Sequence, residues 1–93
     1  MSSWVTGPLQ NGTTSVGTVV IPLSSSTAEF NRGVTINALS TNTGVVYVGA
    51  FDVTTANGFP LAAGQSITIA ALSPAECFVI ASAASQEVRW LGA

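Results

Sequence analysis

Side chains that could carry out chemistry are few in this sequence. Charged residues make up 6% of the 93 residues, against about 25% in an ordinary soluble domain, and His and Lys are absent. Without His, the chain lacks the most common general base and a common zinc ligand. The sequence therefore predicts a protein that is not an enzyme, holds no metal or cofactor and has no small-molecule substrate. The groups that carry charge near neutral pH are Glu29, Asp52, Glu76, Glu87, Arg32 and Arg89.

Two other kinds of reactive site also lack support in the sequence. A carboxylate pair for glycoside hydrolysis, for example Glu29 with Asp52, would need a cleft and a separation of roughly 5–9 Å, and no spacing indicates one. The single cysteine, Cys77, cannot form an internal disulfide. Its apolar neighbours in 77–80 predict a buried thiol that behaves as a small hydrophobic side chain, made in a reducing cytoplasm.

Charge and hydropathy also limit the partners. The net charge is −2 and the two arginines are scattered, so we expect neither nucleic acid nor an anionic membrane as a partner. The first residues lack the pattern of a signal peptide, and no apolar stretch approaches the ~20 residues that cross a bilayer. We expect a soluble protein, or one that becomes part of a soluble particle.

Short runs of β-branched and aromatic residues, each bounded by turn residues, recur along the chain. Six or seven such runs at turn spacings of about 8–12 residues indicate an all-β domain. The sequence predicts a compact β-sandwich or jelly-roll-like domain of six to eight short antiparallel strands, with one helical turn at 26–30 as the only helical candidate. The expected strands are 18–23, 34–38, 45–51, 65–71, 77–82 and 87–91.

The spacing within these runs predicts local features. In 18–23, Val19, Ile21 and Leu23 share one face, and Pro22 places this strand at a sheet edge. Segments 34–38 and 45–51 are separated by a polar turn and are expected to form a hairpin.

Later in the chain, Asn57-Gly58 predicts a turn with positive φ. In the last strand, Trp90 is expected in the core beside Val88, and Arg89 on the opposite face.

The chain is expected to be a single domain, 1–93, with a core at 14–93 and an extended arm at 1–13. The arm shows no convincing periodicity. Trp4, Val5 and Leu9 could anchor it in a groove of a neighbouring subunit, or the arm could fold back on its own domain. The sequence favours neither.

Contact with other proteins is the function that the composition favours. Interface cores are depleted in charge, so a chain this poor in charge is expected to be covered by neighbours; the alternative is a hydrated surface of neutral polar residues. Arg89 suits an interface because it makes bidentate contacts, and Tyr47 could equally be a half-buried strand residue. The predicted interface residues are Trp4, Val5, Leu9, Tyr47, Phe51 and Arg89.

One ordered set of motifs is more specific than composition. The sequence reads VTINA at 34–38, NTGVVYVG at 42–49, VTTANGFPL at 53–61 and GQSI at 64–67, and it closes with VIAS at 79–82 and VRWLG at 88–92. This order resembles a pattern in small all-β virion proteins of tailed bacteriophages, of the capsid cement or decoration type. The resemblance covers about residues 33–92 and leaves out the arm.

The resemblance implies a structural virion protein, made in the cytoplasm of a bacterial host, that binds the outside of a phage capsid and cements neighbouring shell subunits. Its implied partners are itself, as a homotrimer with a dimer as the alternative, and the major capsid protein. The competing interpretation is a tail, fibre or baseplate module that binds protein or carbohydrate, in which Tyr47 or Phe51 beside Asp52 would contact a sugar.

Overall fold

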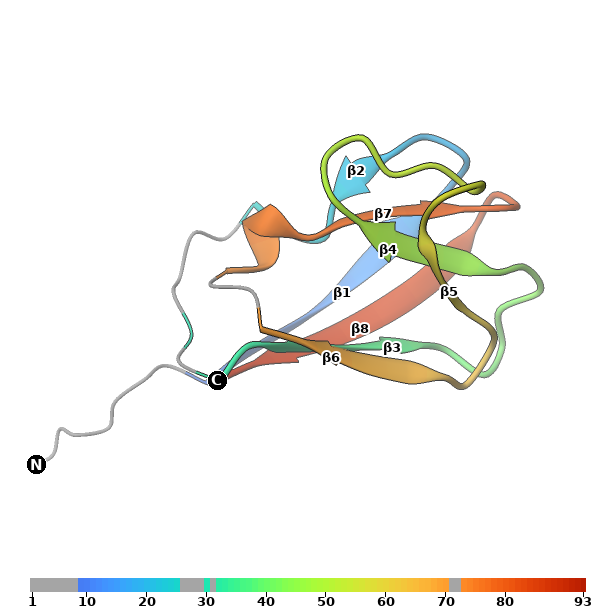
Figure 1. Cartoon of the computed structure of the whole chain (residues 1–93). Coiled ribbons are helices and arrows are strands. Elements are labelled where there is room, and N and C mark those ends of the chain that lie inside the picture. The colour runs from blue at the N-terminus through green and yellow to red at the C-terminus, as the bar shows by residue number, and fades with distance from the viewer. Residues whose placement is uncertain (1–8, 26–29, 31, 71–72) are drawn as a thin grey trace, which may run out of the picture.

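The computed structural model describes residues 9–25, 30, 32–70 and 73–93, and these form eight strands and one short 3-10 turn (Figure 1). The strands are β1 (Gln10–Val16), β2 (Ile21–Pro22), β3 (Val34–Ala38), β4 (Val46–Gly49), β5 (Phe59–Leu61), β6 (Ser66–Ile69), β7 (Phe78–Ala81) and β8 (Gln86–Gly92), and the turn is η2 (Pro74–Glu76).

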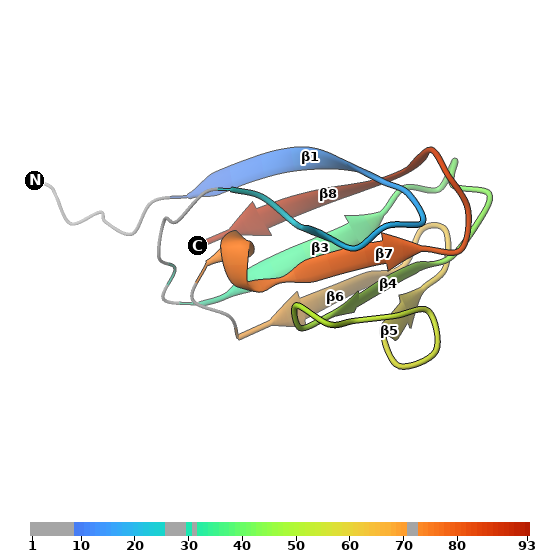
Figure 2. The same ribbon diagram turned by 90° about the horizontal axis from the view of Figure 1, so that it is seen from above.

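The strands form two antiparallel sheets that face each other (Figures 1 and 2). The first sheet has the order β1-β8-β3-β6 and the second the order β2-β7-β4-β5. In both sheets the early strands pair with the late ones: β1 with β8, β2 with β7, β3 with β6 and β4 with β5. The chain therefore runs out through four strands and back through four, and this long hairpin is wrapped so that β8 also pairs with β3 and β7 with β4. This is the jelly-roll arrangement, and it confirms the all-β sandwich that the sequence predicts.

The core lies between the sheets and is made of apolar side chains. Alternation on β3 buries Val34, Ile36 and Ala38. On β8 it buries Val88 and Trp90, where the sequence predicts Trp90 in the core beside Val88. The core cluster comprises Val16, Leu23, Phe30, Val34, Ile36, Ala38, Val46, Val48, Leu61, Cys77, Val79, Ala81, Val88 and Trp90, with Ile21, Ile67 and Ile69 packed against it.

The predicted hairpin of 34–38 with 45–51 is wrong. β3 belongs to the first sheet and β4 to the second, so residues 39–45 cross from one sheet to the other. β3 pairs with β6 and β8, whereas β4 pairs with β5 and β7. Alternation could not distinguish the two arrangements, because a strand buries every second residue whether its successor lies beside it or opposite it.

The strand predicted at 18–23 is shorter than expected. β2 comprises only Ile21–Pro22, and Val19 lies outside it with 69% of its surface exposed, so it does not share the core face. Leu23 is buried as predicted, and its N–H donates to the Cys77 carbonyl over 2.7 Å. The edge position that Pro22 indicates is confirmed, since β2 pairs only with β7.

The boundary of the N-terminal arm at residue 13 is also wrong. Residues 10–13 are the first half of β1, which pairs with β8 over seven positions. The inward position Gly12 lies under the indole of Trp90, and an added Cβ there would be 2.6 Å from Trp90 Nε1. At this inward position β1 has no side chain, and the indole of Trp90 fills the space instead. The sequence of β1 therefore lacks the apolar residue at every second position by which a half-buried strand is usually recognised. Residues 1–8 and most of the helical candidate, 26–29, lie outside the described residues.

The turn predicted at Asn57-Gly58 is present, but Gly58 does not adopt positive φ. Asn57 Oδ1 accepts a hydrogen bond from the Thr54 N–H at 2.8 Å and closes the turn. Glycine is required at 58 because of close packing: an added Cβ would lie 2.6 Å from Tyr47 Cβ and 2.7 Å from Val53 Cγ2.

The β3–β4 and β7–β8 connections are joined by the buried side chain of Gln86, of which 2% is exposed. Its Oε1 accepts hydrogen bonds from the N–H groups of Thr43 and Gly44, both at 2.8 Å, and its Nε2 donates to the Ala84 carbonyl at 2.7 Å. Next to it, the Asn42 side chain exchanges two 2.9 Å hydrogen bonds with the backbone of Glu87. Neutral amides therefore tie this end of the sandwich together.

We predict that Gln86→Ala lowers the free energy of unfolding by about 2–4 kcal/mol, because it leaves the Thr43 and Gly44 N–H groups without their acceptor. Gln65→Ala is the matched control: Gln65 is exposed and its Oε1 accepts one bond, from the Ala62 N–H, so the loss should stay below about 1 kcal/mol. Urea unfolding followed by tryptophan fluorescence measures both, and equal losses would contradict the assigned role of Gln86.

Candidate interaction surface

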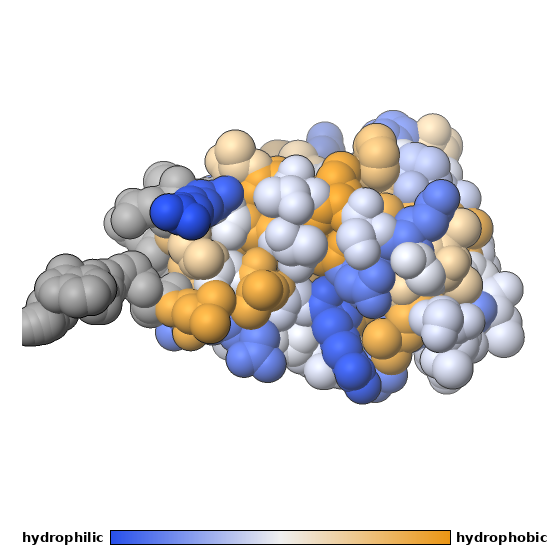
Figure 3. All heavy atoms as spheres, turned by 90° about the horizontal axis from the view of Figure 1, so that it is seen from below, coloured by the Kyte–Doolittle hydropathy of each residue, from blue (hydrophilic) through white to orange (hydrophobic). Residues whose placement is uncertain are grey.

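The outer face of the first sheet is mostly polar, and Glu87 and Arg89 are its charged residues. Figure 3 looks onto this face, where white and blue residues, of neutral or hydrophilic character, predominate and hydrophobic residues in orange lie among them. We call this surface the polar face. It is formed by Asn11, Thr13 and Ser15 on β1, Glu87, Arg89 and Leu91 on β8, Thr35 and Asn37 on β3, and Ser66 and Thr68 on β6.

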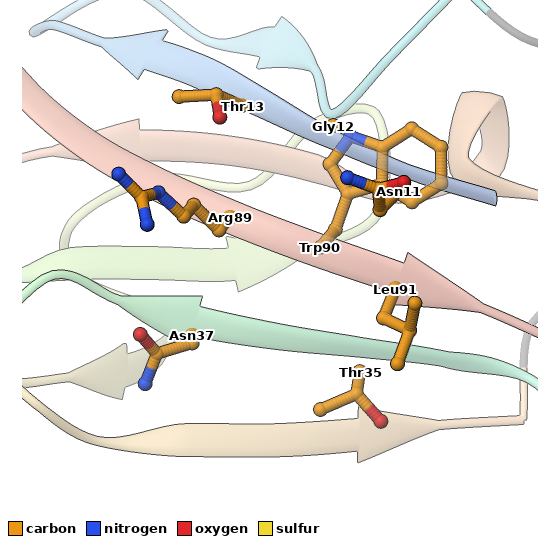
Figure 4. A pocket seen from close by; sticks show the side chains of 8 residues that line it. All are labelled: Asn11, Gly12, Thr13, Thr35, Asn37, Arg89, Trp90 and Leu91. Carbon is orange, nitrogen blue, oxygen red and sulfur yellow. The ribbon is translucent and has the colours of Figure 1, made fainter.

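A shallow groove of about 340 Å³ lies on the polar face over β1, β8 and β3 (Figure 4). Arg89 is at its centre, since its register partners are Thr13 on β1 and Asn37 on β3. The exposed guanidinium makes no hydrogen bond or ion pair with any part of the chain that the structure describes. Its five N–H donors therefore remain available for a carboxylate or a row of carbonyls on another molecule.

The two halves of the polar face differ in how their polar groups are satisfied. Across β3 and β6, Thr35 Oγ1 and Thr68 Oγ1 share a hydrogen bond of 2.8 Å, and Asn37 Nδ2 donates to Ser66 Oγ at 2.8 Å. Side chains on this half bond to one another, so the half that contains β1 and β8 is the one that offers donors and acceptors outward.

The outer face of the second sheet is partly covered by the chain itself. The β4–β5 connection, residues 50–58, lies over this sheet (Figure 1), and its Val53 is buried there against Gly49 and Gly58, outside the main core cluster. Tyr47 lies on this face between its register partners Pro60 and Ile80 and is half-buried. Its exposure fits the interpretation of a half-buried strand residue.

The predicted interface residues do not form one patch. Arg89 lies on the polar face, Tyr47 lies on the outer face of the opposite sheet, and Phe51, 73% exposed, lies in the β4–β5 connection. Leu9 directly precedes β1 and is 68% exposed. Trp4 and Val5 lie outside the described residues.

Sequence reasoning missed the neighbours of Arg89. Thr13 and Asn37 flank it, and Leu91, 47% exposed, follows on the same face of β8. Alternation along β8 could have identified Leu91 and alternation along β3 could have identified Asn37. Thr13 was hidden because β1 carries no hydrophobic period.

The acidic residues are separated from one another. Asp52 lies in the β4–β5 connection, Glu76 in η2 and Glu87 on β8, while Glu29 is outside the described residues. Within the described ranges, no three His, Cys, Asp or Glu side chains come close enough to hold a metal ion, and no helix has the length and hydropathy to cross a membrane. Comparison of the chain with protein-family models, with curated proteins and with solved structures gave no match.

Cys77 is buried beside β7, as the sequence predicts. Burial raises the pKa of its thiol above the ordinary 9.0, and the neighbouring Glu76 carboxylate raises it further. The thiol is therefore protonated at neutral pH and is a poor nucleophile.

This pKa shift predicts a stability that falls as pH rises above 9.0, because the thiol then ionises in the unfolded chain while it stays protonated in the folded one. The free energy of unfolding, measured with urea at about pH 7 and about pH 10, should decrease more for the wild type than for Cys77→Ala. The variant retains every other titrating group and serves as the control. An equal decrease in both proteins would show that Cys77 does not contribute.

Proposed function

We propose that this chain is a structural virion protein that binds the outside of a phage capsid and cements neighbouring shell subunits. The observation that carries the proposal is the polar face: an open sheet surface of mainly neutral polar residues, with Glu87 and Arg89 as its charged residues. The Arg89 guanidinium lies at the centre of a shallow groove and has no partner among the described residues. Small-molecule sites are usually concave and enclosed, whereas a surface of this shape fits a second protein surface.

Arg89 supplies the specificity of the proposed contact. The other charged residue of the face is Glu87 on the same strand, and the Arg89 guanidinium would select a carboxylate or carbonyl cluster on the shell protein. The surrounding Thr and Asn side chains hydrogen-bond without imposing a charge pattern. Each single contact of this kind is weak, and cementing follows when symmetry repeats it over many adjacent shell subunits.

Two further observations support a structural role. The jelly-roll fold is one that viral capsid proteins use, although lectins and enzymes use it too, so the fold alone does not decide. The low charge content of the chain fits a surface that neighbouring proteins cover. The resemblance of the motif order over about residues 33–92 to small virion proteins is the reason for proposing a phage particle as the setting.

The alternative is a tail, fibre or baseplate module that binds protein or carbohydrate. One observation favours it: Phe51 and Asp52 are consecutive and both exposed in the β4–β5 connection, and an aromatic ring beside a carboxylate suits a sugar. Tyr47 is half-buried under Gly58 and adds little exposed ring surface. Retention on a glycan array that Phe51→Ala abolishes, without any binding to heads, would favour this alternative.

The proposal is tested with particles of the phage that encodes the chain, prepared without it and mixed with the purified protein. We expect the chain to bind the heads and to raise the temperature at which they release DNA. Arg89→Ala should weaken binding at least about tenfold, because Arg89 is the one charged donor among the described residues that line the groove.

Arg32→Ala is the matched control, since Arg32 is the other arginine of the chain and is exposed away from the groove. It should leave binding unchanged. Heads that do not bind the chain, or a loss that is equal in the two variants, would contradict the proposal.

A further inference from the structure

Strand β1 is an edge strand of the first sheet, and no other described strand pairs with its outer side. Figure 2 shows β1 along one margin of the molecule, with β8 on its inner side. Among the described residues, its backbone pairs with no strand other than β8. Open edges invite another strand, and proteins usually blunt them with proline, with lysine or by keeping them short.

The other three edges of the sandwich are blunted and β1 is not. The two edge strands of the second sheet each contain a proline, Pro22 in β2 and Pro60 in β5. β6, the far edge of the first sheet, has four residues. β1 has seven residues, with neither a proline nor a charged side chain.

The hydrogen-bond pattern identifies the backbone groups that face the open edge. Leu39 N–H donates to the Glu87 carbonyl over 3.2 Å, so the odd-numbered residues of β8 direct their backbone groups toward β3. In an antiparallel ladder the alternate residues face the other neighbour, so Val88 and Trp90 bond toward β1. Their register partners there are Thr14 and Gly12.

The intervening β1 residues, Asn11, Thr13 and Ser15, therefore direct their N–H and C=O groups away from β8 toward the open edge. The same alternation continues across the sheet, where the Ala38 N–H donates to the Gln65 carbonyl at 2.9 Å, toward β6. The side chains of these three β1 residues are exposed on the polar face.

We propose that two copies of this chain pair through their β1 edges, antiparallel and about a two-fold axis at Thr13. The three outward-facing residues are symmetric about Thr13, so Thr13 pairs with its own copy while Asn11 pairs with Ser15 in both directions. Each pair exchanges two N–H···O bonds. The two four-stranded sheets become one continuous sheet with the polar face on one side.

A second copy is the occupant because the strand is compatible with itself. Asn11, Thr13 and Ser15 are neutral, so no like charges meet at the axis, and a cross-strand Thr-Thr pair is favourable. The two Arg89 side chains, one strand inward on each β8, lie about 14 Å apart across the seam, which is three strand spacings. On the inward side, Gly12 and Thr14 have no bulky side chains of their own, and the indole of Trp90 that fills the space at Gly12 is buried.

This inference deepens the proposed assembly function and rests on it for its role in the particle. It makes the self-contact two-fold, in place of the trimer that the resemblance implies. Its test uses the free chain without shells, so a monomer would overturn the pairing and leave shell binding undecided, whereas heads that do not bind a dimeric chain would overturn only the proposed function.

The test is the mass of the full chain in solution, by size exclusion with light scattering up to high micromolar concentration. We expect the wild type to approach twice the 9.4 kDa of one chain. Thr13→Pro removes an N–H that bonds to no other described strand of the same chain, so it should keep the fold and halve the mass. Thr13→Val is the matched control, since it keeps the N–H and a β-branched side chain, and should remain paired.

Amide hydrogen exchange of the wild type provides a second measurement that does not depend on Thr13→Pro folding. Protection of the Asn11, Thr13 and Ser15 amides should fall on dilution, while the Gly12 and Thr14 amides, which bond to β8, stay protected. Any one of three results would overturn the pairing. The wild type could be monomeric or trimeric over the whole concentration range, or the Thr13→Pro variant could keep the doubled mass. The third is that amide protection at residues 11, 13 and 15 does not depend on concentration.

Discussion

The position of β8 in the first sheet is the constraint on which most of the structure depends. This strand pairs with β1 on one side and with β3 on the other, although β1 begins the described fold and β8 ends it. Its even-numbered residues place Val88 and Trp90 in the core, and its odd-numbered residues place Arg89 on the polar face. The sheet therefore cannot be completed until the last strand joins. Pairings this distant in sequence are typical of folds that form slowly.

Hydrogen bonds of neutral amide side chains hold together one end of the sandwich. The Gln86 side chain joins the β3–β4 and β7–β8 connections, and the Asn42 side chain bonds to the backbone of Glu87 beyond the end of β3. Every buried polar side-chain atom that the structure describes has a partner. None of the charged side chains that the structure describes is buried. Among them, Arg89 is the one that lies at the centre of a groove, which is why the proposed contact is placed there.

Much of the fold could be predicted from the sequence, and its connectivity could not. Alternation gave β3 and the buried pair Val88 and Trp90 correctly, and Pro22 gave an edge strand. The assignment of 34–38 and 45–51 to one hairpin failed because alternation records which residues are buried and not which strand lies alongside. β1 escaped detection because its inward position at Gly12 is filled by the indole of Trp90, a residue that is distant in sequence.

The candidate surface was predicted in part. Arg89 was identified because it alternates with Trp90, and the structure places it where the sequence does. Tyr47 and Phe51 were grouped with it on composition, yet they lie on the second sheet and its connection, since residue type carries no information about which sheet a strand joins. Composition could not predict which backbone groups of β1 face the open edge, because these groups are set by the register of β1 with β8.

Cryo-electron microscopy of the purified phage particle tests the central claim most directly. We expect density for this jelly roll on the outer surface of the head, bridging adjacent shell subunits, with the polar face and Arg89 turned toward the shell. A head that carries no such density, or density for this domain only on the tail, would contradict the proposed role.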